Sequence, residues 1–284
     1  MIERVREHAG SVIFARVAGP EGPRRRERIH ATEGPRRFAP DDPIWRVHSD
    51  ASMFVGGIRA LLLQSLHPLA MAGVDQHSGF RGDPWGRLQR TSGFLAETTF
   101  GTIEHADRSI GAVRRIHERV RGTADDGRPY AASDPHLLRW VHVAEADSFL
   151  RAHDRYGSRR LSPTERDRYV AQSAVTARLL GATDLPEDVA ALEEALRAYR
   201  PELHSTPAAR EAARFMLLRP PVPWAIRPPY GLLAAAAVGL LPRWARVPLR
   251  LPWLPITEAT AVRAGGTVVT RAIGWAMSPP ERST

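Results

Sequence analysis

Two histidines lie at positions where helical spacing points the imidazole toward the apolar interior of the protein. His117 lies among apolar residues that recur with helical spacing over 104–121, and His142 lies on the apolar side of the next helical segment, beside Trp140. A buried imidazole is either a core residue with satisfied nitrogens or a ligand for a metal or a haem iron. Because two successive segments carry the pattern, both histidines are candidate cofactor ligands.

Two further histidines flank a corner of the chain. His67 precedes Pro68 at the end of an apolar helical segment, and His77 lies in a Gly-, Asp- and Pro-rich connection over 73–86. Both would order the corner beneath a cofactor, so they rank as second candidates. The histidines with polar neighbours are expected on the surface: His8, His30, His105, His136, His153 and His204.

Two residue types are absent from the sequence, and their absence excludes several kinds of catalytic and metal-binding site. The sequence of 284 residues has no cysteine and no lysine. These absences exclude disulfides, thiolate-bound zinc, iron–sulfur clusters, thiolate-ligated or covalently attached haem, and a lysine Schiff base. Any metal must be held by histidines, carboxylates or a cofactor ring.

Short motifs give no strong competing assignment. A di-iron bundle needs Glu-x-x-His pairs on two helices, and the one such pair, Glu27 and His30, falls in an arginine-rich stretch. Zincin, nucleophile-elbow, Walker A and dinucleotide-binding motifs are absent from the sequence. An apolar helical interior with inward histidines suits b-type haem held by one imidazole. Arg87 and Arg90, on one helix face, would hold haem propionates or oxygen, or else form a solvated face.

The elements that would position these residues are helices. Helices are expected over 50–66, 87–99, 104–121, 135–150, 162–180, 187–199, 207–218, 229–241 and 257–275. Ser162 to Glu165 form a capping box, and Asp134 with Pro135 forms a helix start. Since no segment alternates apolar and polar residues between hairpin turns, the predicted fold class is all-α. The Arg- and Pro-rich segment 1–44 is expected to be irregular, and 45–284 to form one helical domain.

The charge of the chain does not indicate nucleic-acid binding. The net charge is +9, but all 40 cations are arginines spread over most of the sequence. No signal segment opens the chain, so a cytoplasmic location is expected. The longest apolar run, 230–241, is too short to span a bilayer. It is flanked by tryptophans and arginines, which would suit peripheral contact with a membrane.

Long strings of the sequence resemble a known family. They are GGIRALLLQSLHPLAMAGVDQHSGFRGDPWGRLQRTSGFLAETTFGT over 56–102 and RIHERVRGTADDGRPYAASDPHLLRWVHVAEADSFL over 115–150, followed by YVAQSA and LLGATDLP. These strings resemble the rubber-oxygenase catalytic domain family, which includes the latex clearing proteins and the fungal oxygenase of the mycophenolic acid pathway. The resemblance extends over residues 45–260.

The resemblance implies an all-helical, globin-related b-haem protein that uses O2 to attack double bonds of isoprenoid or similarly apolar chains. In the latex clearing proteins an Arg-x-x-Lys-Thr element lies on the distal side of the haem, and a later histidine is the axial ligand. Arg87, Arg90 and Thr91 match that element, and His117 stands at a comparable spacing. Arg90 replaces the lysine; a guanidinium can stabilise bound oxygen but cannot lose its proton to act as a base.

The sequence therefore predicts a haem b-dependent oxygenase, an oxidoreductase whose iron is ligated by His117. Arg90 and Thr91 would polarise O2, and Arg87, His142, His67 and His77 would surround the cofactor. Its substrate would be a small apolar molecule. The alternative is a non-catalytic haem- or lipid-binding helical protein at a membrane surface.

Overall fold

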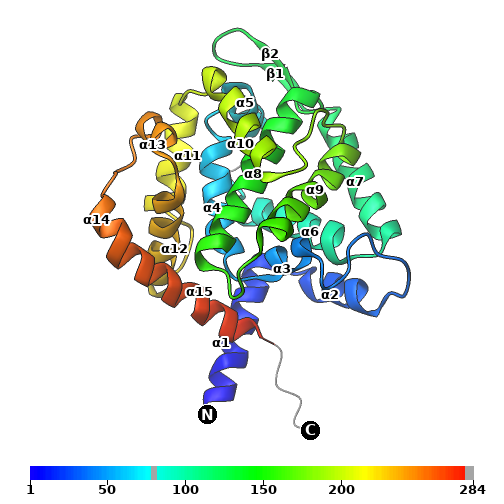
Figure 1. Cartoon of the computed structure of the whole chain (residues 1–284), viewed down its shortest axis with the longest axis vertical. Helices are drawn as coiled ribbons and strands as arrows, with labels where there is room; N and C mark the ends of the chain where they lie inside the picture. Colours follow the sequence, from blue (N-terminus) through cyan, green and yellow to red (C-terminus); the bar gives the residue numbers. More distant parts are fainter. Residues whose placement is uncertain (78–81, 279–284) are drawn as a thin grey trace.

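The computed structural model of the chain describes residues 1–77 and 82–278 and is mostly helical (Figure 1). Helix makes up 73% of the structure, and a small two-stranded sheet is its one sheet within the described residues. This confirms the predicted helical class.

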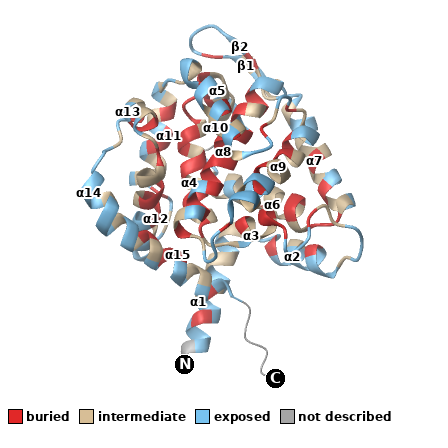
Figure 2. Cartoon of the chain, viewed as in Figure 1, coloured by how far each residue is buried: buried red, intermediate tan, exposed pale blue. Residues whose placement is uncertain are grey.

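The centre of the molecule is a pair of helices. The longest helix, α8 (Pro135–Tyr156), packs along α4 (Met53–Gln64), and buried residues concentrate on both (Figure 2). A buried ion pair joins them: Arg59 Nη2 lies 2.7 Å from Asp147 Oδ2, and Arg59 Nη1 donates to Ser148 Oγ at 2.6 Å. This hydrogen-bonded pair fixes the rotation of α4 against α8.

The other helices surround that pair. α12 and α15 pack on one part of it, α9 and α10 on another, while α6 packs against α1, α2, α3 and α7. Their bounds are α1 Ile2–Ala18, α2 Gly22–Ala31, α3 Pro43–Ser49, α5 Pro68–His77, α6 Pro84–Phe100, α7 Ile103–His117, α9 Pro163–Leu180, α10 Val189–Ala198, α11 Pro207–Leu218, α12 Arg227–Leu240, α13 Arg243–Leu249, α14 Pro255–Thr257 and α15 Arg263–Met277, with short turns η1 Arg200–Glu202, η2 Trp224–Ile226 and η3 Glu258–Val262.

Local sequence sets several helix ends as predicted. Asp134 caps α8, with Pro135 at its first position. Ser162 and Glu165 form the reciprocal capping box of α9, and Gly181 ends that helix at φ 110, a conformation that favours glycine. These ends depend on residues adjacent in the chain, which is why the sequence predicts them.

The expectation of an irregular segment 1–44 is wrong, because the structure has α1 and α2 there. Arg25 and Arg28 of α2 both contact Glu97 of α6, at 3.2 and 3.0 Å. α1 packs against α6 and α15. Partners distant in sequence therefore order a charge run that looks unable to fold by itself.

The boundaries of α7 and α5 also differ from expectation. α7 ends at His117, and the chain continues into β1 (Arg121–Thr123), which pairs antiparallel with β2 (Pro129–Ala131). Gly122 lies opposite Tyr130, whose hydroxyl would be 2.7 Å from a Cβ at that position. The expected connection 73–86 instead continues helix α5 to His77, and its residues 78–81 lie outside the described residues.

No helix of the described chain is by itself long and apolar enough to cross a membrane. Taken together, α4 and α5 have sufficient length and apolar composition, but they are bent by 107° from one another.

Candidate functional site

Helices α6 and α7 form a hairpin with two residues, Gly101 and Thr102, between them (Figure 1). The side chain of Thr102 caps the start of α7, and Ser109 of α7 donates to Glu97 of α6 at 2.5 Å. The two helices therefore pack side by side close to the turn.

The predicted distal and axial residues lie in the parts of these two helices that are away from the turn. Arg87, Arg90 and Thr91 occupy the first two turns of α6, and His117 is the last residue of α7. The start of α6 contacts the end of α1, where Gln89 and Ser92 donate to the carbonyl oxygens of Arg16 and Val17, whereas the end of α7 leads into β1. The grouping of these four residues around a haem therefore stays a prediction.

His117 is half-buried, and its imidazole is neutral. Burial lowers the pKa of this histidine from its ordinary value. Its Nδ1 atom is buried and has no hydrogen-bond partner within the described part of the chain. A neutral imidazole is the form that coordinates iron. The predicted apolar face of α7 is wrong at Ile116, which is 56% exposed because the last turn of the helix reaches the surface.

The two arginines lie close together, as predicted. Burial lowers the pKa of Arg87, and the nearby charge of Arg90 lowers it further. Arg90 is largely exposed, with Nη1 3.2 Å from Oδ2 of Asp83, the residue that caps α6. Thr91 is exposed, and so is Leu88. The start of α6 therefore presents the cation of Arg90, a hydroxyl and an apolar side chain to solvent, while Arg87 is partly buried.

His142 and Glu145 of α8 face a different neighbourhood. Burial, followed by the charge of Arg178 on α9, lowers the pKa of His142 to about 4, and its buried Nε2 atom has no partner among described residues. Burial raises the pKa of Glu145 to about 7, and the charge of Glu145 contributes to raising the pKa of Tyr169 on α9. Neither α6 nor α7 is a main packing partner of α8, so the structure does not bring His142 beside His117.

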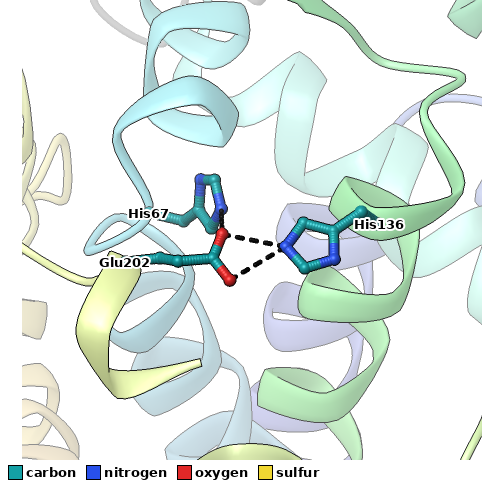
Figure 3. Close-up of side chains that lie close together, drawn as sticks. All are labelled: His67, His136 and Glu202. Carbon is teal, nitrogen blue, oxygen red and sulfur yellow. Dashed lines mark hydrogen bonds and ion pairs between the residues drawn. The ribbon is translucent and has the colours of Figure 1, made fainter. Parts of the chain in front are cut away.

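The corner histidines have partners other than His117. The His77 ring nitrogen Nε2 lies 3.1 Å from the hydroxyl of Tyr130 on β2. His67, which is 1% exposed, points toward His136 and Glu202 instead (Figure 3). Neither is grouped with His117, so their expected role beneath a cofactor stays a prediction.

Sequence reasoning missed several buried or paired groups. His153, expected on the surface, is 3% exposed, and His136 contacts Glu202 at 2.8 Å. His48 was not singled out; burial lowers its pKa to about 4, and its Nδ1 lies 2.8 Å from Thr99 Oγ1. For His153, polar neighbours along the chain gave the wrong signal, because tertiary packing decides the surroundings of a side chain, whereas His136 is exposed as expected.

Comparison with known proteins identifies one family. The family described as "ER-bound oxygenase mpaB/B'/Rubber oxygenase, catalytic domain" matches residues 45–272. No curated protein and no solved structure matches the chain. The matched region contains the whole α6–α7 hairpin and the central pair α4–α8. By this match over most of its length, the chain belongs to the family of the ER-bound oxygenase mpaB/B' and rubber oxygenase catalytic domains.

Proposed function

We propose that the protein is a haem b-dependent oxygenase in which His117 ligates the iron and an apolar, isoprenoid-like molecule is the substrate. Membership of an oxygenase family supports an oxidoreductase. The observation that carries the haem assignment is the imidazole of His117, whose buried Nδ1 has no hydrogen-bond partner in the described chain and whose pKa is lowered by burial. A globin-related helix arrangement is part of this proposal.

Residues of α6 and α7 fit the chemistry of b-type haem. The macrocycle is apolar and carries two carboxylates, so a site needs one imidazole, cations and apolar contacts. His117 offers the imidazole, Arg87 and Arg90 offer guanidinium groups that pair well with carboxylates, and Leu88 and Ile116 are exposed apolar side chains. When bound, the haem supplies the redox-active iron that reacts with O2.

The side chains of the protein have separate tasks in this proposal. His117 holds the cofactor, and its neutral form needs no deprotonation at neutral pH. Arg90 stays positively charged and stabilises negative charge that develops on oxygen, and the hydroxyl of Thr91 donates a hydrogen bond to the same region. The contact of Arg90 with Asp83 is exposed, so exchanging it for another anion costs little.

Oxygen uptake tests this function. Haem-loaded protein under reducing conditions is given an unsaturated isoprenoid, and O2 consumption is recorded for the wild type, His117→Ala and His105→Ala. The wild type and His105→Ala, which loses another imidazole of α7, should consume O2 with the substrate, and His117→Ala should not. A haem-loaded wild type that consumes no O2 would support the non-catalytic alternative.

A second function is favoured by one surface. We infer that the C-terminal third contacts a membrane surface, as a peripheral protein of the cytoplasm. Large apolar side chains are exposed there: Leu218, Trp224, Ile226, Val247, Trp253, Leu254, Ile256, Val268 and Trp275. Arginines lie among them; Arg243, for example, stacks over Trp253 at 4.0 Å. Tryptophan with arginine is typical of an interfacial surface.

Binding to vesicles that contain anionic lipids tests this surface. Trp224 and Ile256 are 82% and 81% exposed, so replacing both by glutamate should weaken vesicle binding without changing the fold. The matched control replaces the exposed Ile116 of α7 by glutamate and should bind vesicles as the wild type does. Equal vesicle binding by all three proteins would contradict the inference.

A further inference from the structure

Three ligand-type side chains from distant parts of the chain meet at the start of α8 (Figure 3). His67 follows the end of α4, His136 lies in the first turn of α8, and Glu202 ends η1 between α10 and α11. One ligand atom from each lies within 4.8 Å of the others. His136 Nε2 is 2.8 Å and His67 Nε2 is 3.4 Å from Glu202 Oε2.

His67 is the buried member of this group, and its ring nitrogens are unpartnered. The side chain of His67 is 2% exposed, and Trp140 and Tyr199 lie beside its ring. Its contact with Glu202 lacks hydrogen-bond geometry, so neither Nδ1 nor Nε2 has a hydrogen-bond partner in the described chain. Burying a polar group without a hydrogen bond is unfavourable. A ligand that takes a lone pair from this imidazole would remove that cost.

We propose that His67, His136 and Glu202 bind a divalent transition-metal ion, a site separate from the α6 and α7 residues assigned to haem. Two imidazole nitrogens and one carboxylate are a donor set for Zn²⁺ or Fe²⁺. The set has too few oxygens for Ca²⁺ or Mg²⁺. In a tetrahedral zinc site, ligand atoms lie about 3.4 Å apart, so the observed separations need only small side-chain movements.

The neighbours of His136 orient its ring for binding the ion. The hydroxyl of Tyr199 donates to the carbonyl oxygen of His136 at 2.8 Å and lies 3.5 Å from its Nδ1. When Nε2 binds the ion, the imidazole proton is carried by Nδ1, which can then donate to the Tyr199 oxygen. Such outer hydrogen bonds fix the tautomer and orientation of metal-bound histidines.

The charges around these three side chains are compatible with a bound cation. Arg128, in the turn between the strands, acts electrostatically on both His67 and Glu202. Its charge is offset by Asp126, whose carboxylate lies 2.7 Å away. The side chains of His136 and Glu202 are 48% and 41% exposed, so water can reach the ion from that side. Three protein ligands with an open position are the arrangement of a reactive, rather than closed, metal site.

Titration with Zn²⁺ tests the site. The protein carries no affinity tag, and a chelator has first removed any bound metal from it. Isothermal calorimetry with Zn²⁺ should show one site per chain in the wild type. Glu202→Gln and His136→Ala alter half-exposed side chains, so they should fold normally and bind Zn²⁺ about 100-fold more weakly. His30→Ala, which removes an exposed histidine of α2, is the matched control and should keep the wild-type affinity.

Cobalt supplies a second readout. Co²⁺ bound by the wild type should give the intense visible absorption of a four-coordinate ion, and the two ligand variants should lack it, with circular dichroism confirming their fold. No zinc binding by the wild type, or affinities in Glu202→Gln and His136→Ala equal to that of His30→Ala, would overturn the proposal. Haem binding by the same variants should be unchanged, which distinguishes this site from the haem site.

Discussion

The α6–α7 hairpin and the central pair α4–α8 hold their polar residues in opposite ways. Near the start of α6, Arg90 is exposed and its ion pair with Asp83 lies within a single helix. In the central pair, Arg59 is 1% exposed and its partners Asp147 and Ser148 come from another helix. Exposed pairs contribute little to stability, whereas the loss of one member of a buried pair is costly.

The difference between the two regions predicts which substitutions change function and which change stability. The cation of Arg90 can exchange its partner for a ligand, because water already surrounds it. The buried ion pair of the central helices has no such freedom, since Arg59 is shielded from water and the other oxygen of Asp147 already pairs with Arg151 at 3.0 Å. Substitutions in the hairpin should therefore change function while the fold survives, and substitutions in the central pair should change the fold itself.

The largest expected effect is on the buried ion pair. Arg59→Met leaves Oδ2 of Asp147 buried without a cation, although Arg151 still pairs with Oδ1 at 3.0 Å, so the free energy of unfolding should fall by about 3 kcal/mol. Urea denaturation measures it. The control is Arg197→Ala, which breaks an exposed pair with Glu194 and should cost at most about 0.5 kcal/mol. Similar losses in both variants would remove the distinction between the two regions.

A change of function without a change of fold is expected at Arg90. Arg90→Ala should keep haem and the wild-type unfolding midpoint but lower turnover by roughly ten- to a thousandfold, because oxygen loses its stabilising cation. Arg90→Lys should retain part of the activity, since it keeps a positive charge. The lifetime of the ferrous–O2 complex in wild type and Arg90→Ala checks this. Equal lifetimes would exclude Arg90 from the distal side.

A smaller, pH-dependent effect is expected at Glu145 of α8. Burial raises its pKa from the ordinary 4.5 to about 7, so the folded protein holds a proton there that the unfolded chain releases. The stability from this group is present below pH 4.5, decreases as pH rises to 7, and is lost above it. Glu145→Gln is uncharged at every pH and should be more stable than the wild type at pH 8, by ~3 kcal/mol.

Urea unfolding of Glu145→Gln and the wild type at pH 5 and pH 8 measures that effect. Burial lowers the pKa values of His48 and His142 to about 4, so both oppose folding as pH falls from 6.5 to 4. These histidines are present in both proteins, and their contribution therefore cancels in the difference. A stability difference that is the same at pH 5 and pH 8 would show that Glu145 keeps an ordinary pKa in the folded protein.

The sequence predicts the parts of the fold that local interactions decide. The caps at Asp134 and Ser162 and the terminating Gly181 act on backbone groups within a few residues, so their helices begin and end as expected. Helix α2 could not be predicted in this way, because Glu97 of a later helix holds its arginines. The strands β1 and β2 are three residues each, too short for a recognisable alternation.

At the candidate sites, too, the sequence predicts what neighbouring elements decide and not what distant parts of the chain decide. Arg87, Arg90 and His117 lie in two consecutive helices that the sequence predicts, and the family resemblance supplies their expected roles. His67, His136 and Glu202 come from three separate parts of the chain, and no spacing in the sequence relates them. The packing of α4 on α8 brings the first two together, which only the structure reveals.

Titration of haem into protein from which bound haem has been removed tests the assignment of His117 as the iron ligand most directly. The Soret band is recorded as haem is added to wild type, His117→Ala and His142→Ala, with circular dichroism as the check of fold. The wild type and His142→Ala should bind haem with the same spectrum, and His117→Ala should show a shifted, weaker band. An unchanged spectrum and haem occupancy in His117→Ala, with loss in His142→Ala, would contradict the assignment of His117 as the iron ligand.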